Sequence, residues 1–214
     1  MGFGPFPRAI GLYGKGHLTR IGGDEEGETR VSLTLVRWGG LAGMVAGVLY
    51  TLIGIIGPQS PVFPSFSDYL IEVLAVALLF TLVAIAALHV LQRDRYGRLG
   101  AAGSLTAFIG YALVLLAVIA NALAGREVLG IVPSLGALGA LVGLILLGSA
   151  SLRAGMLPPW CGVLLIAGFP LSTVLDILVF ANAGDILRGV IWALVGYVLW
   201  SQTDAATEQA SRVN

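Results

Sequence analysis

Six long apolar segments, separated by short polar or glycine- and proline-rich connections, account for most of this chain of 214 residues. A helix needs about 20 apolar residues to cross the hydrocarbon core of a bilayer, which is about 30 Å thick. The pattern therefore predicts an all-α membrane protein, a bundle of six transmembrane helices. The expected spans are residues 38–56, 69–91, 99–124, 129–152, 159–181 and 186–202.

Two polar segments flank the predicted transmembrane domain, residues 35–202. Residues 1–34 are rich in glycine and contain four acidic residues close together, Asp24, Glu25, Glu26 and Glu28. A segment of such low hydrophobicity rarely packs a core, so we expect a flexible arm here. It lacks the continuous apolar stretch of a cleaved signal peptide, so we expect the first span to act as an uncleaved insertion signal. Residues 203–214 form a tail.

Arginine and lysine residues are concentrated on one side of the predicted bundle, and this asymmetry predicts its orientation. With the N-terminus in the cytoplasm, all but two of the twelve basic residues lie on the cytoplasmic side, which is the bias of the positive-inside rule. The two exceptions are Arg126 and Arg188. The short connection with Arg93, Arg95 and Arg98 favours the same orientation. Both termini and the two flanking segments are therefore expected in the cytoplasm.

Two of the six spans contain irregular features. The apolar core of the last one covers about 15 residues, near 22 Å at 1.5 Å per residue. It crosses the bilayer only if the helix continues to about Thr203 and the Arg188 side chain extends outward. The alternative is a protein of five spans whose last helix lies in the interface. In the fifth span, Pro170 leaves the carbonyl of Ile166 without its backbone donor and predicts a local kink.

Small residues at four-residue spacing mark the surfaces on which the helices are expected to pack. Lipid is as apolar as leucine, so close approach of backbones, and not burial, drives helix association in a membrane. The first span carries Gly39, Gly43 and Gly47, and the fourth carries Gly139 and Gly143. Packing within one bundle is the favoured interpretation. The alternative is a homodimer that forms through the groove of the first span.

Charged and amide groups inside the spans are the candidates for function, because a charge at mid-bilayer costs about 2.5–3.5 kcal/mol on insertion scales. Four of them fall near the outer ends of their spans: Glu72, Asn121, Asp176 and Arg188. One interpretation is an outward-facing polar pocket, in which Asp176 or Glu72 binds a proton, a cation or a polar ligand. The favoured one is structural, with Asp176 and Arg188 as an ion pair that fastens the last helical hairpin and Glu72 in contact with water.

Other residues exclude several classes of site. The single cysteine, Cys161, cannot form an intrachain disulfide, and the only lysine, Lys15, lies in the arm, where it cannot form a retinal Schiff base in a span. Ser149 has no histidine or lysine base in a span near it. His89 is expected to be a polar residue near the interface. The zero net charge gives no bias toward nucleic acid, and no metal, cofactor or enzymatic activity is predicted.

Two segments resemble a known group of proteins. At Arg95–Gly100, and at Leu157–Gly168, where an L-P-x-W-x-G-x-L-L-I-x-G run opens a late span, the chain is similar to small uncharacterised polytopic membrane proteins of bacteria, chiefly actinobacteria. The resemblance covers roughly residues 35–200. It implies a fold and a place in a bacterial cytoplasmic membrane, with no activity attached.

Two functions of different classes follow as expectations. The first is a non-enzymatic scaffold or partner subunit, held in the lipid bilayer as a homo-oligomer or beside a membrane partner protein. The second is a small-solute or proton-coupled transporter that uses Asp176, Glu72 and Arg188. A cavity lined by Asp176 and Glu72 would favour transport, and side chains sealed in pairs within a tight bundle would favour the scaffold.

Overall fold

The computed structural model describes residues 24–57, 67–93, 95, 97–124, 127–178 and 183–213, and over these residues every regular element is a helix. The elements are α1 (Asp24–Ile56), α2 (Ser67–Gln92), α3 (Gly97–Ala124), α4 (Val132–Ala154), α5 (Pro159–Val163), the π-helix η2 (Leu164–Gly168), α6 (Phe169–Leu178) and α7 (Ala183–Val213). α5, η2 and α6 follow one another without a break and together form one span.

Within the described residues, six spans are long enough and apolar enough to cross a membrane. They are Thr34–Ile56, Tyr69–Gln92, Gly97–Ala124, Val132–Ala154, Pro159–Leu178 and Ala183–Thr203. The predicted fold class, an all-α bundle of six transmembrane helices, is confirmed, and the protein is a multi-pass membrane protein. The last span contains 21 residues because its helix begins at Ala183, ahead of the predicted start. The predicted orientation stays a prediction.

The helices extend into both predicted flanking segments. α1 begins at Asp24, so residues 24–34 are helical, while residues 1–23 lie outside the described residues. Likewise, α7 continues to Val213 through most of the predicted tail. The apolar pattern predicts only the part of a helix that lies in lipid. Beyond that part, in either direction, the helix continues where the residues have good helix propensity, as glutamate, arginine and alanine do.

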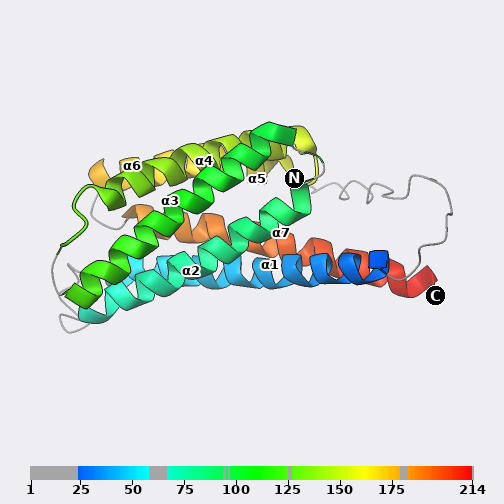
Figure 1. The fold of residues 1–214 in the computed structure, drawn as a ribbon, viewed down its shortest axis with the longest axis horizontal. Helices are drawn as coiled ribbons and strands as arrows, with labels where there is room; N and C mark the ends of the chain where they lie inside the picture. The colour runs from blue at the N-terminus through cyan, green and yellow to red at the C-terminus, as the bar shows by residue number, and fades with distance from the viewer. Residues whose placement is uncertain are drawn as a thin grey trace, which may run out of the picture.

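The helices form two groups that lie side by side in Figure 1. α1 packs along α7 and α2, whereas α3 packs along α4. The fifth span joins the groups, since α5 and η2 contact α4 and α6 contacts α7. One end of the bundle is called the distal end. At this end, α1, α3 and α6 finish and α2, α4 and α7 begin. The first turns of α1 and the last turns of α7 lie at the opposite end (Figure 1).

Glycines bring α1 into backbone contact with α7. A Cβ atom at Gly47 would lie 2.5 Å from the amide nitrogen of Ala193, and one at Gly43 would lie 3.0 Å from Cα of Gly196. Gly39 faces Ala87 of α2 instead. The groove of the first span is therefore filled by helices of the same chain, as packing within one bundle requires.

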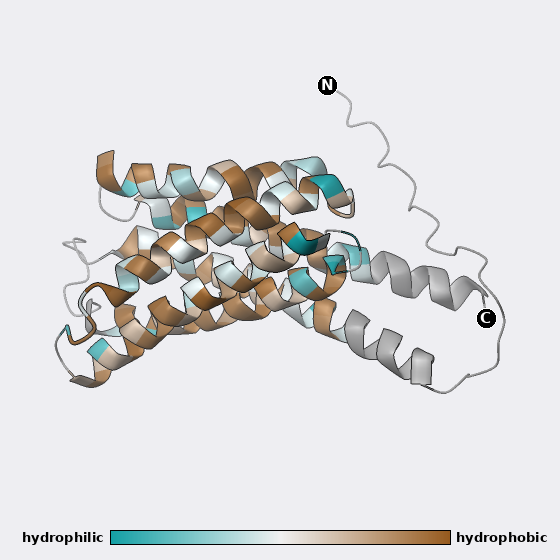
Figure 2. Cartoon of the chain, turned by 45° about the horizontal axis from the view of Figure 1, so that its top comes forward, coloured by the Kyte–Doolittle hydropathy of each residue, from teal (hydrophilic) through white to brown (hydrophobic). Residues whose placement is uncertain are grey.

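The outer surface of the bundle is hydrophobic. Figure 2 shows brown, hydrophobic residues spread over all the helices, and Leu105, Leu138 and Ile177 are 60%, 59% and 76% exposed. Exposure of this kind on every side would make a water-soluble protein aggregate. It is the surface that a lipid environment requires.

The fifth span contains the irregularity that Pro170 predicts, in a different form from a simple kink. The five residues Leu164–Gly168 form the π-helix η2, which ends directly before Phe169 and Pro170. A π-helical turn holds an extra residue compared with an α-helical turn, so it rotates every side chain that follows it. The direction in which α6 presents its polar residues therefore depends on η2.

Candidate functional site

A cavity of about 700 Å³ lies between the helices, and all six spans contribute to its wall. Most of the wall is apolar, with Leu74 and Leu78 from α2, Leu144 from α4 and Phe169 from α6. Pockets that hold small molecules in proteins have volumes of about 300–1,000 Å³ and are lined mainly by apolar and aromatic residues. In size and lining, this cavity falls within that class.

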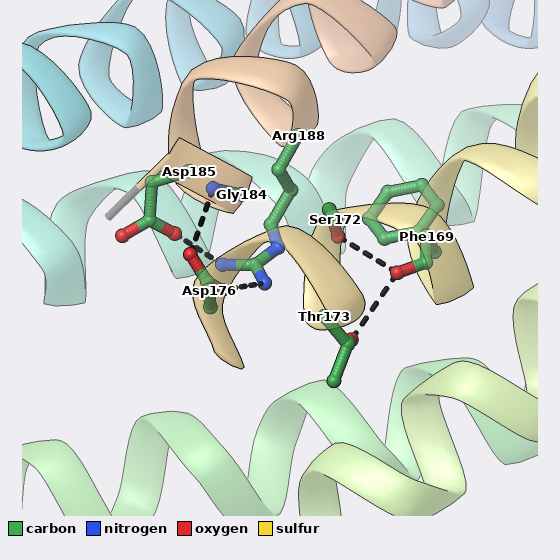
Figure 3. A network of polar contacts seen from close by, with 7 residues as sticks. All are labelled: Phe169, Ser172, Thr173, Asp176, Gly184, Asp185 and Arg188. Atoms are coloured by element: carbon green, nitrogen blue, oxygen red, sulfur yellow. Dashed lines mark hydrogen bonds and ion pairs between the residues drawn. The ribbon is translucent and has the colours of Figure 1, made fainter. Parts of the chain in front are cut away.

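Three charged residues lie in the wall of the cavity, Asp176 on α6 and Asp185 and Arg188 on α7. Figure 3 shows the Arg188 guanidinium group joined by dashed lines to both carboxylates. Its Nη2 lies 3.5 Å from Asp176 Oδ2, and its Nη1 donates to Asp185 Oδ1. The side chains of Asp176, Asp185 and Arg188 are 30%, 16% and 22% exposed, so all three are only partly shielded. We call these three residues the ion cluster.

The sequence around the turn from α6 to α7 explains how the ion cluster forms. Asp185 lies in the first turn of α7, where the positive end of the helix dipole favours a carboxylate. Arg188 follows three residues later, on the same side of the helix. Asp176, near the end of α6, accepts a hydrogen bond of 2.7 Å from the Gly184 backbone amide through its Oδ1. Asp176 therefore ties the end of α6 to the start of α7.

Gly184 is required at this position because the two helices meet there. A Cβ atom at Gly184 would collide with the carbonyl oxygen of Ser172 and would lie 2.6 Å from Cγ of Asp176. Any larger residue would push the start of α7 away from α6, and with it Asp185 and Arg188.

Arg188 has a third partner on α1. Its guanidinium carbon lies 5.8 Å from the centroid of the Tyr50 ring, a distance at which a cation is attracted to the face of an aromatic ring. Tyr50 is 1% exposed, so its ring is fixed within the bundle. The guanidinium group is thus held from α1, α6 and α7.

Two hydroxyl groups of α6 also line the cavity, those of Ser172 and Thr173. Both donate to the carbonyl oxygen of Phe169, at 2.7 Å and 3.2 Å (Figure 3). Their protons are therefore used within the helix.

Aromatic rings support one side of the cavity. Tyr111 and Phe169 line it, and each packs edge-on against Trp192, with ring centroids 6.3 Å and 5.7 Å apart. Trp192 is completely buried. Edge-to-face pairs of this kind restrict the rings to few orientations, which gives the wall a fixed shape.

The structure divides the four residues that the sequence singles out. It brings Asp176 and Arg188 together, as described above, but Glu72 is exposed on α2 and does not line the cavity. Asn121 does not line it either; its Oδ1 accepts a hydrogen bond of 3.0 Å from the Val128 amide and so holds the connection between α3 and α4. Of the three residues in the pocket interpretation, only Asp176 and Arg188 line the cavity. The exposed position of Glu72 is the one that the favoured, structural interpretation expects.

Sequence reasoning missed Asp185. The predicted span started at residue 186, so Asp185 was assigned to a turn outside it, whereas the helix begins at Ala183. The available signal was the spacing of Asp185 and Arg188, which places opposite charges on one side of a helix start.

The two glycines that were predicted to mark the packing surface of the fourth span differ in how closely a neighbouring helix approaches them. A Cβ atom at Gly143 would collide with the backbone of Ala107 on α3, whereas one at Gly139 would have its nearest neighbour, Cα of Gly110, at 3.6 Å. Gly143 is therefore a contact point of α3 and α4, and Gly139 has room for a methyl group.

His89 lies away from the cavity, between α2 and α3. Its Nδ1 is 2.7 Å from Oγ of Ser104, so this histidine links two spans. Among the described side chains, no three histidine, cysteine, aspartate or glutamate residues are grouped so that they could hold a metal ion.

No protein-family model, curated protein or solved structure matches this chain. The geometry of the cavity and of the ion cluster is therefore the basis for a functional proposal.

Proposed function

We propose that this protein is a small-solute transporter whose binding site is the cavity between the six spans. The observation that carries the proposal is a cavity of about 700 Å³ with a charged cluster in its wall. A bundle that only has to hold together gains nothing from such a space, because lipid-embedded helices are stabilised by close contact.

The π-helix of the fifth span supports the same proposal. This span contributes Ser172, Thr173 and Asp176 to the cavity and contains the π-helix η2 ahead of them. π-helical turns are frequent at functional sites.

We further propose that the protein lies in a bacterial cytoplasmic membrane with both termini inside. The arginines at positions 93, 95, 98 and 153 support this orientation, and the resemblance of residues 35–200 to bacterial polytopic proteins supports the membrane. The distal end would then face outward, and the ion cluster would lie in the outer half of the bilayer.

A second candidate, a non-enzymatic scaffold or partner subunit, is favoured by a different observation. Both oxygens of Asp176 have partners, the Gly184 amide and Arg188. A cluster that only fastens α6 to α7 would make the same contacts. The two candidates differ in whether water reaches the cavity.

Water access can be measured with cysteine variants in a Cys161→Ala background. Thr173 lines the cavity, whereas its neighbour Val174 is 44% exposed on α6 and does not line the cavity. A thiol reacts with a charged methanethiosulfonate reagent only as a thiolate, which forms in water and not in lipid. We expect Thr173→Cys to react and Val174→Cys to remain unmodified.

The reaction is followed by mass spectrometry of the protein in native membrane vesicles. If neither cysteine reacts, the cavity is closed to water, and the scaffold is the better proposal. Reaction of both cysteines would mean that α6 is solvated on all sides, which contradicts its place in a membrane-spanning bundle.

A further inference from the structure

We propose that the cavity selects hydrophobic cations with a single positive charge. The charged group would lie beside Asp185 and Asp176, and the apolar body would lie along Leu78, Leu144 and Phe169. This inference rests on the proposed function and names the class of its solute.

The charge of the ion cluster favours a cation. Two carboxylates share one guanidinium group, so one negative charge lacks a partner within the cluster when both are ionised. An unpaired charge away from water is costly. A ligand with one positive charge would remove that cost, whereas an anion would increase it.

The polar atoms that are available to a ligand also favour a cation. Arg188 is occupied by Asp176, Asp185 and the ring of Tyr50, so it offers little to an anion. Asp185 accepts from Arg188 through Oδ1, and among the described residues no donor bonds to its Oδ2. The free acceptor capacity of the cluster is therefore on a carboxylate that lines the cavity.

The largely apolar lining of the cavity supports the same class of solute. Tyr111 and Phe169 line it, whereas the ring of Tyr50 is already occupied by Arg188. The rest of the lining is largely aliphatic, so it would exclude a small hydrated ion and suit a cation that carries its charge on an apolar body.

Binding of two probes of the same shape and opposite charge tests the inference. Tetraphenylphosphonium is a hydrophobic cation, and tetraphenylborate is its anionic counterpart. The full chain is reconstituted in lipid nanodiscs, and each radiolabelled probe is measured by equilibrium dialysis against empty nanodiscs, which report partition into lipid. We expect saturable binding of the phosphonium ion above the empty discs and none of the borate ion.

Three variants connect the binding to the site. Asp185→Asn should weaken phosphonium binding about tenfold or more, which corresponds to about 1.4 kcal/mol. Glu72→Gln removes an exposed carboxylate outside the cavity and should leave the affinity unchanged, which controls for surface charge. Ala137→Trp places a large side chain in the wall of the cavity and should abolish saturable binding without touching the ion cluster.

The possible failures separate this inference from the proposed function. Saturable borate binding that Ala137→Trp abolishes would overturn the preference for cations and would leave the cavity as a binding site. Equal loss of phosphonium binding in Glu72→Gln and Asp185→Asn would also overturn it. No saturable binding of either probe, with Thr173→Cys still reactive, rejects the solute class alone. With Thr173→Cys unreactive as well, the inference and the proposed function both fail.

Discussion

At the scale of single residues, Arg188 holds the ion cluster together. It is the only cation in the wall of the cavity, as far as the described residues show, and it faces two carboxylates from different helices. Removal of either carboxylate would leave an ion pair. Removal of the guanidinium group would leave two like charges, only partly in contact with water, close to each other.

This asymmetry predicts unequal effects of neutral substitutions. Arg188→Gln should lower the free energy of unfolding by about 2–3 kcal/mol, since it leaves uncompensated carboxylates. Asp176→Asn keeps the oxygen that accepts from Gly184, so it should cost about 1 kcal/mol or less. Unfolding in increasing concentrations of sodium dodecyl sulfate, in mixed micelles, measures both.

The double variant Arg188→Gln/Asp185→Asn provides the control. It removes one carboxylate together with the guanidinium group and should recover part of the loss. If Arg188→Gln alone were as stable as Asp176→Asn, the carboxylates would not repel each other, and the cluster would not carry an excess negative charge.

The residues of the site show which parts could be predicted from the sequence. Asp176 and Arg188 were paired correctly because a short connection keeps α6 and α7 antiparallel and adjacent. The direction of Glu72 stayed open between two interpretations because α2 is apolar on every side, so the pattern does not reveal which side faces the bundle. The cavity itself, with Tyr50 and Tyr111 in its wall, depends on helix directions that no local pattern contains.

At the scale of elements, the pairs α1–α7 and α3–α4 are held by contacts that exclude even a methyl group. Gly47 meets the backbone of Ala193, and Gly143 meets that of Ala107. Backbone atoms cannot move aside as a flexible side chain can. These contacts fix the distance between the helices on each side of the cavity.

Two identical substitutions four residues apart on α4 test this view. Gly143→Ala should destabilise the protein by about 1–3 kcal/mol, the usual cost of overpacking. Gly139→Ala, with 3.6 Å to its nearest neighbour, should be neutral or stabilising by up to about 1 kcal/mol through helix propensity. Thermal unfolding in detergent compares the two, and equal midpoints would show that α3 and α4 are not in close contact at Gly143.

At the scale of the whole molecule, the number of spans could be predicted because lipid allows few structures. Only helices and closed barrels satisfy every backbone polar group in the hydrocarbon core, so length and apolarity decide. The outer ends of α1 and α7 could not be predicted for the opposite reason, because outside the lipid a helix is not obliged to stop. Orientation depends on charges beside the membrane and not on the apolar pattern.

The orientation is testable with two exposed positions at opposite ends of the bundle, Arg95 and Glu127. In the Cys161→Ala background, Glu127→Cys should react with a membrane-impermeant maleimide on intact cells. Arg95→Cys should react only after permeabilisation. The reverse pattern would place both termini outside and the ion cluster in the half of the bilayer next to the cytoplasm.

The π-helix η2 also has a consequence for how such a site could arise or disappear. Each residue of an α-helix turns the chain by about 100°, so loss of one residue within Leu164–Gly168 would swing all of α6 by that angle. Asp176 would then point away from Arg188, although no side chain of the cluster had been changed. A single codon inserted or deleted in this stretch would thus be enough to gain or lose the charged wall in one genetic event.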